Sequence, residues 1–287
     1  MYLFDTVKLI NRSLVKWFLV SLIVFSSITS LNACLSPQNS TSTDDYQVKK
    51  VNLDTIKSAK AGVKHTKSSS SSDFLLPKSL TKPQLIAQTP YTPKQQYIPA
   101  DPTNYGQRYA KDYKGKPVDN DWLVVLHETV YSANSAINTF TKANYRDEDQ
   151  VSYHALIKLD GTIIYLVPPE YRAYGAGNSV FMSARGEETV QTNPQLPPSV
   201  NNFAYHVSLE TPPDGANSNP YHSGYTEYQY HSLAWLLGHF KISSDRITTH
   251  KQVDRSGQRA DPRSFERQKF LGLFQSYQKF IQYQADT

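Results

Sequence analysis

The lack of apolar periodicity in residues 34–95 limits where this chain can build a hydrophobic core. That segment is rich in Ser, Thr, Gln, Lys and Pro, and it contains an unbroken serine run, Ser68–Ser72. It cannot bury enough apolar surface to offset the entropy lost on ordering it, so we expect a flexible tether. The hydrophobic fraction of 39% and the mean hydropathy of -0.53 therefore average this tether with a folded domain, which we place at residues 96–287.

The N-terminus has the features of a secretory signal. Lys8, Arg12 and Lys16 precede an apolar run, Trp17–Ile28, and small residues follow it. The strictly apolar run is too short for an ordinary transmembrane helix. We therefore interpret residues 1–33 as a signal peptide, with an uncleaved signal anchor as the alternative.

Cys34 is the one cysteine of the chain, which excludes an intramolecular disulfide. It follows Leu31-Asn32-Ala33, and this segment resembles the lipobox of bacterial lipoproteins, whose cysteine is acylated and becomes the new first residue. The resemblance implies lipidation at Cys34 and anchoring of an exported protein to a membrane. Because Leu35 rather than aspartate follows, it favours the outer membrane where the cell has one.

The charge of the chain selects no partner by itself. A net charge of +5 and a pI near 9.0 suit nucleic acid, anionic lipid or an acidic polymer, and are too small to choose among them. The lysines of residues 34–95 fit either weak attraction to an anionic wall or membrane, or a solvated linker kept soluble by its charge. We prefer the second interpretation.

Periodic signals from about Tyr97 onward predict an α/β fold, a mixed central sheet flanked by helices in a single domain. The turn Asp160-Gly161 indicates a hairpin between two of the strands. Strands are expected at Trp122–Leu126, Ser152–Lys158, Thr162–Val167 and Tyr205–Glu210. Three helices are expected: Ser135–Asn144, a second that begins after the N-cap residue Thr226 and runs to Phe240, and Ser264–Tyr283.

Three polar residues are candidates for a metal site. His127 ends a strand of buried type, His250 follows Ile247–Thr249, and Asp261 comes 11 residues later. Zinc accepts imidazole nitrogen and carboxylate oxygen, and a catalytic site keeps a fourth position for water. Spacing alone leaves open whether these residues are ligands or ordinary structural and solvated groups.

Five segments, in order, give the chain a resemblance to the N-acetylmuramoyl-L-alanine amidase family, which includes phage amidases and animal peptidoglycan-recognition proteins. These segments are Val124–Thr129, Val151–Ile163, Val207–Glu210, Thr249–Lys251 and Arg259–Pro262. The resemblance implies an amidase domain with zinc at one face of the sheet, bound by His127, His250 and Asp261.

The same resemblance implies catalytic roles for three residues. Glu210 matches the glutamate that assists catalysis, although a two-residue shift would place Ser208 there; the strand pattern favours Glu210. Tyr153 matches a tyrosine near the metal-bound water. Arg259 stands where many relatives have lysine, and it keeps the positive charge that can stabilise an oxyanion.

Other residues receive simpler interpretations. Strand alternation points Glu128 away from the metal. His154 matches a family histidine that is not a ligand, so a packing or supporting role is expected. Gly175 departs from the family, because relatives often carry Trp-His-Ala-Gly where this chain has Tyr174-Gly175-Ala176-Gly177. Ordinary surface or helix positions are expected for four further histidines, His206, His222, His231 and His239.

The implied reaction is hydrolysis of the amide bond between N-acetylmuramic acid and L-alanine. The implied partners are peptidoglycan or muropeptides and the membrane reached through Cys34, with no nucleic acid, and we expect a monomer. Two alternatives remain. Some relatives bind peptidoglycan without cutting it, typically after losing a zinc ligand, and a structural lipoprotein could tether wall to membrane. Filled ligand positions favour catalysis over the binding module, and bound zinc would separate both from a purely structural lipoprotein.

Overall fold

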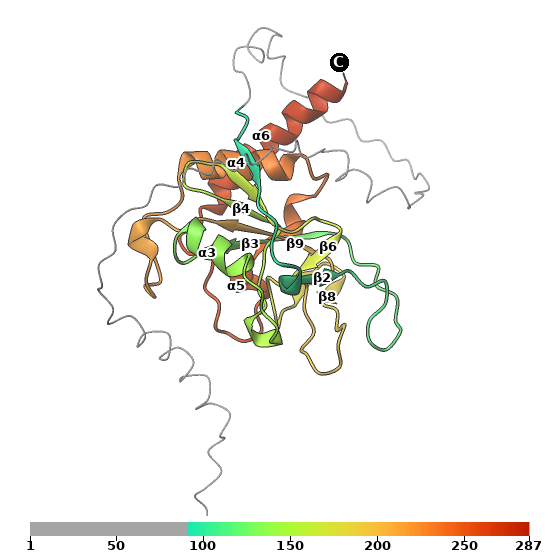
Figure 1. Ribbon diagram of the computed structural model, residues 1–287. Coiled ribbons are helices and arrows are strands. Elements are labelled where there is room, and N and C mark those ends of the chain that lie inside the picture. Colours follow the sequence, from blue (N-terminus) through green and yellow to red (C-terminus); the bar gives the residue numbers. More distant parts are fainter. Residues whose placement is uncertain (1–90, 287) are drawn as a thin grey trace, which may run out of the picture. The chain divides into compact units, whose positions relative to one another are not determined.

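A mixed sheet forms the centre of residues 91–286, the part of the chain that the computed structural model describes (Figure 1). Within these residues its six strands run in the order β1-β5-β4-β9-β3-β10. β4 and β5 are antiparallel, and the other neighbours are parallel. The strands are β1 Gln95–Tyr97, β3 Leu123–Glu128, β4 Ala155–Ile157, β5 Ile163–Tyr165, β9 Ala204–Leu209 and β10 Ile247–Thr249.

Shorter elements complete the domain. Two antiparallel pairs flank the sheet, β2 Tyr105–Gln107 with β6 Tyr171–Ala173 and β7 Phe181–Ser183 with β8 Gly186–Glu188. The α-helices are α3 Ala133–Phe140, α4 Glu227–Gly238, α5 His250–Val253 and α6 Arg267–Ala285, and the short 3-10 helices are Pro102–Asn104, Asp147–Asp149, Pro213–Gly215 and Ser244–Arg246.

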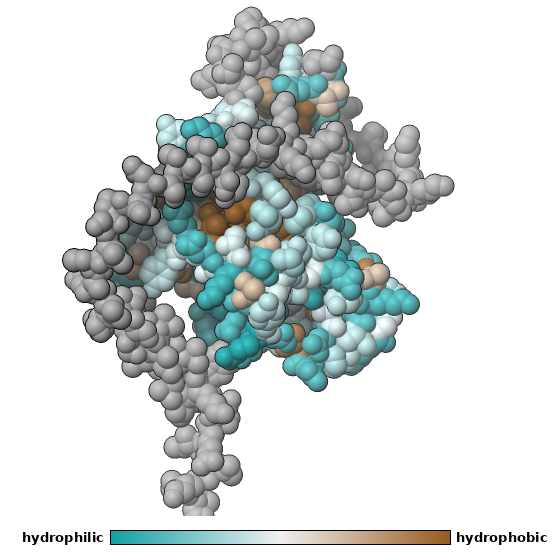
Figure 2. All heavy atoms as spheres, viewed as in Figure 1, coloured by the Kyte–Doolittle hydropathy of each residue, from teal (hydrophilic) through white to brown (hydrophobic). Residues whose placement is uncertain are grey.

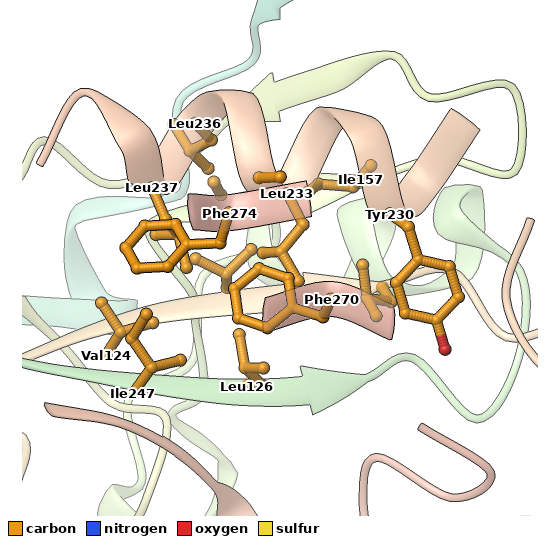
Figure 3. Close-up of a cluster of buried hydrophobic side chains, with 14 of the residues drawn as sticks. Val124, Leu126, Ile157, Tyr230, Leu233, Leu236, Leu237, Ile247, Phe270 and Phe274 are labelled. Atoms are coloured by element: carbon orange, nitrogen blue, oxygen red, sulfur yellow. The ribbon is translucent and has the colours of Figure 1, made fainter. Parts of the chain in front are cut away.

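Helices α4 and α6 cover one face of the sheet (Figure 1). Strand alternation sends Val124 and Leu126 of β3 to this face, where Phe270 and Phe274 of α6 are fully buried against them (Figure 3). Full burial of a phenylalanine stabilises the fold by about 1.5–3 kcal/mol. Figure 3 shows the two rings between the leucines of α4 and the side chain of Leu126, so the two helices and β3 share one core.

The opposite face carries α3, α5 and the loops. Leu123 and Val125 of β3 pack there with Val253 of α5, and Leu156 of β4 packs with Phe140 of α3. This face is less completely covered by helix, and polar residues near the ends of β3 and β9 project from it. The sheet therefore has one hydrophobic face covered by α4 and α6, and a second face on which polar side chains gather near the ends of β3 and β9.

The predicted α/β architecture is confirmed. Thr226 is the N-cap of α4, and a capping box with Gln229 fixes the start of the helix. Helix α3 starts two residues before the predicted position because Ser132 caps it, accepting a hydrogen bond from the Ser135 amide. The strands predicted at Ser152–Lys158 and Thr162–Val167 are present with shorter bounds, since the residues at their ends leave the hydrogen-bonding ladder. The strand predicted at Trp122–Leu126 instead continues to Glu128, and the one predicted at Tyr205–Glu210 begins and ends one residue earlier.

Residues 91–95, placed by sequence at the end of the tether, pack against the domain. The Tyr91 hydroxyl lies 2.8 Å from the Ser232 hydroxyl of α4, and β1 begins at Gln95 and pairs with β5. The predicted signal peptide, residues 1–33, and residues 34–90, which include Cys34, lie outside the described residues. None of the helices between residues 91 and 286 has the length and hydropathy needed to cross a membrane. Figure 2 shows mainly hydrophilic side chains on the described surface in view.

Candidate metal centre

Parallel pairing brings the predicted ligands to one edge of the sheet. β3 ends at His127-Glu128, and β10 pairs with it in parallel, with Thr249 opposite Leu126. The next residue, His250, therefore arrives beside His127. Thr249 also caps α5, and its capping box with Gln252 fixes His250 as the first residue of that helix.

Asp261 completes the group from a loop that is fastened to α5, because the Lys251 amide donates to the Asp261 carbonyl at 2.9 Å. One carboxylate oxygen of Asp261 lies 3.2 Å from His127 Nδ1, and the other lies 3.0 Å from His250 Nδ1. One ligand atom of each residue lies within 4.8 Å of the others. The structure thus brings together the three residues predicted as ligands.

The donor set fits a zinc ion. Two imidazole nitrogens and one carboxylate oxygen match a catalytic zinc site with one position left for water. The His127 side chain is completely buried, whereas those of His250 and Asp261 are 8% and 14% exposed. Access to the group is therefore from the side of His250 and Asp261.

The protonation states also suit metal binding, which requires neutral imidazole and ionised carboxylate. Burial lowers the pKa of His127 to about 4 and outweighs the hydrogen bond to Asp261 that opposes it. Burial would raise the pKa of Asp261, but its hydrogen bonds with His127 and His250 hold that pKa well below the ordinary value.

Tyr153 and Arg259 lie beside this group. The Tyr153 ring stacks on the His127 imidazole with 4.4 Å between ring centroids. Burial raises the pKa of Tyr153 strongly, and the nearby positive charge of Arg259 only partly opposes this. Arg259 is exposed, and no hydrogen bond of its guanidinium is found among the described residues. It can therefore reach toward a ligand that enters from solvent.

Glu210 lies just beyond β9, on the sheet face that also carries His127. One carboxylate oxygen accepts from the Ala133 amide at 2.7 Å, and the other accepts from the Leu159 amide at 2.9 Å. Ala133 is the first residue of α3, where a negative charge is favoured by the helix dipole. These contacts fix the carboxylate between the first residue of α3 and the turn at Leu159, and its catalytic role stays a prediction.

Ser208, the alternative position, lies closer to the ligands in the sheet. It pairs with His127 across β3 and β9, so both side chains lie on one face. Its hydroxyl is buried and has no hydrogen-bond partner among the described residues. A buried hydroxyl without a partner is unusual and is consistent with a group that meets water or substrate at this face.

The expectation that His206 and His222 occupy ordinary surface or helix positions is wrong. His206 is fully buried on β9, and its Nδ1 lies 2.9 Å from His127 Nε2. The signal was present in the strand period, because His206 shares a face with Ser208 and Glu210. His231 and His239 do lie on or at the end of α4, as expected.

His154 has the expected supporting role, since its Nδ1 accepts a hydrogen bond from the His206 backbone amide at 2.9 Å.

Glu128 points away from the metal group, as predicted, and makes a buried ion pair. Its carboxylate accepts from the Arg263 guanidinium, from the Tyr225 hydroxyl at 2.8 Å, and contacts His222 Nε2 at 3.1 Å. Arg263 also donates to three carbonyls of the loop that contains Asn217. Because Arg263 lies two residues after Asp261, this network anchors the segment that carries the third ligand.

Comparison with protein families gives one match, to a family model described as N-acetylmuramoyl-L-alanine amidase. It covers residues 115–264, more than half of the chain, and includes all three candidate ligands. No curated protein matches significantly.

Several solved structures are similar at low sequence identity. AmpD from Citrobacter freundii is 23% identical, with 64% of this chain and 92% of that chain covered and a TM-score of 0.40. An N-acetylmuramoyl-L-alanine amidase, LysC from Clostridium intestinale, is 21% identical, with 63% and 97% covered and a TM-score of 0.35. AmpDH3 from Pseudomonas aeruginosa, in complex with anhydromuramic pentapeptide, is 18% identical, with 53% and 60% covered and a TM-score of 0.36.

Proposed function

Because the chain belongs to the N-acetylmuramoyl-L-alanine amidase family, we propose that it uses zinc bound by His127, His250 and Asp261 to hydrolyse the amide between N-acetylmuramic acid and L-alanine. The observation that carries the metal assignment is the convergence of two imidazoles and a carboxylate at one sheet edge. The substrate is peptidoglycan or the muropeptides released from it.

A bound zinc ion would lower the pKa of water and polarise the scissile carbonyl. Arg259 is exposed beside the site, so its guanidinium can stabilise negative charge that develops on the carbonyl oxygen. Tyr153 keeps its hydroxyl proton at neutral pH, since a phenol titrates near pH 10 and burial raises its pKa further, and it can donate to the same oxygen. The remaining task is to take a proton from water and give it to the leaving amine nitrogen.

We assign that proton transfer to Glu210. Its two backbone hydrogen bonds hold the carboxylate in place, and each oxygen retains a further lone pair. Glu210→Gln should leave zinc content unchanged and reduce turnover about 10²–10⁴-fold, the usual contribution of a general acid–base group. Amide hydrolysis and zinc content are measured on the same preparation.

Ser208→Ala is the matched comparison, because Ser208 is the other position that the sequence match allows. Unchanged turnover in Glu210→Gln would remove Glu210 from the chemistry. Urea unfolding of both variants separates loss of turnover from loss of the contacts that Glu210 makes with α3.

Digestion of purified peptidoglycan, followed by mass analysis of the products, tests the reaction itself. Cleavage at the proposed bond releases stem peptides with a free L-alanine amino group. Retention on peptidoglycan without released products would instead support a binding module, the alternative that the resemblance leaves open.

We further propose that the protein is exported and held on a membrane through lipidated Cys34, with the outer membrane favoured by Leu35. The order of charged, apolar and small residues before Cys34 supports this. Cys34→Ser should move the protein from the membrane to the soluble fraction after cell lysis, while Ser36→Ala should not. Persistent membrane association of Cys34→Ser, sedimenting like the parent, would rule out the lipid anchor.

A further inference from the structure

His206 is the histidine whose position most departs from expectation. It lies on β9 opposite Val125, with its ring on the face that carries His127. The two rings are 5.1 Å apart between centroids, and His206 Nδ1 is the hydrogen-bond partner of His127 Nε2. His206 is not one of the three residues whose ligand atoms converge, which are His127, His250 and Asp261.

The direction of this hydrogen bond follows from the position of Asp261. His127 Nδ1 faces the Asp261 carboxylate and His250, so Nδ1 is the atom available to a metal ion. A neutral imidazole that offers Nδ1 as a ligand carries its proton on Nε2. That N–H is buried, and the His206 Nδ1 lone pair is the acceptor 2.9 Å away.

We propose that His206 is a positioning residue for the zinc site, and this rests on the zinc-dependent function proposed above. Its Nδ1 accepts the Nε2–H of His127, which fixes both the ring orientation and the tautomer of that ligand. Outer partners of this kind commonly raise ligand basicity and metal affinity.

The backbone holds His206 in place for this role. The His206 amide donates to His154 Nδ1 at 2.9 Å, and the His154 amide donates to the His206 carbonyl at 3.0 Å. The two imidazoles are nearly parallel, with an interplanar angle of 9°. His206 is therefore held by its place in β9 and by both the backbone and the imidazole of His154, the residue preceding β4.

Gly175 supplies the space for the His206 ring. A Cβ at position 175 would lie 2.5 Å from His206 Nδ1 and 2.6 Å from its Cγ, closer than real contacts allow. Any side chain at position 175 would therefore displace the His206 ring. Gly175 and His206 form a complementary pair in this chain.

Four variants of the full chain test the proposal by zinc affinity, measured in competition with a chelator. His206→Leu removes the acceptor, and Gly175→Ala displaces the ring without changing either histidine. Both should weaken zinc binding about 10–100-fold, the usual effect of losing an outer-shell partner. His206→Asn places an amide oxygen near the position of Nδ1 and should restore most of the affinity.

Gly177→Ala is the steric control, because no atom lies within 4 Å of a Cβ at that position, and it should bind zinc like the parent. Parental affinity in both His206→Leu and Gly175→Ala would overturn the proposal. Absence of zinc binding by the parent chain would instead reject the proposed function, and the inference with it.

A measurement on the unaltered protein avoids any effect of substitution on folding. In the zinc-loaded chain, ¹⁵N chemical shifts should show His206 Nδ1 unprotonated and His127 Nε2 protonated. A proton on His206 Nδ1 in that state would contradict the assigned hydrogen bond.

Discussion

Replacement of His250 with alanine is expected to remove bound zinc and to abolish amidase activity. The substitution deletes one of two imidazole donors and leaves His127 and Asp261, which cannot complete a three-ligand site. The loss of zinc affinity should exceed the roughly 10–100-fold effect typical of outer-shell partners. Zinc content after dialysis and the rate of amide cleavage give the two readouts.

His239→Ala is the matched control for this experiment. His239 follows α4 and bonds to the Trp235 carbonyl, away from the ligands. That variant should keep about one zinc per chain, as the three-ligand site predicts. If His250→Ala retained both zinc and cleavage, the ligand assignment would be wrong, and a different residue would have to supply the second nitrogen.

Glu128→Gln should cost more stability than an equivalent change at the surface. The side chains of Glu128 and Arg263 are 1% and 6% exposed, so loss of the carboxylate leaves a buried guanidinium without its counter-charge. Breaking a buried pair in this way costs about 3–5 kcal/mol in the free energy of unfolding. Urea unfolding of the zinc-free protein measures the change without a contribution from bound metal.

Glu187→Gln removes the carboxylate of a comparable pair that lies at the surface. Glu187 is 60% exposed and its partner Arg255 is 32% exposed, although the two groups are only 2.6 Å apart. The expected cost is about 0–1 kcal/mol. Equal losses of unfolding free energy in the two variants would contradict the expectation that the buried Glu128–Arg263 pair costs more to break than the exposed one.

The fold was predictable wherever the sequence had a clear period or cap. The apolar run before His127 forms a buried strand, and Thr226 caps a helix whose leucines face the sheet. Strand lengths were not predictable, because β4 and β5 end where pairing ends and not where the apolar pattern ends. β1 was missed, since Gln95–Tyr97 has no alternation and joins the sheet only through its pairing with β5.

The candidate site was predictable where a family motif marked the residue, as for His127, His250 and Asp261. No family motif identified the histidine that hydrogen-bonds to His127. His206 comes close to His127 because β9 and β3 pair in a register that no local pattern specifies. The contacts of Glu210 likewise depend on α3 and on the loop at Leu159, which approach only in the folded domain.

The position of β10 at the edge of the sheet links metal binding to local opening. Among residues 91–286, β10 pairs with a strand on one side only, and the residue after it is His250. A metal ion shared by His127 and His250 would cross-link this strand to β3 and stabilise the paired form of β10 by a free energy that grows with the logarithm of the metal concentration. Amide hydrogens of β10 should therefore exchange with solvent more slowly when zinc is present, while those of β9, paired on both sides, should change less.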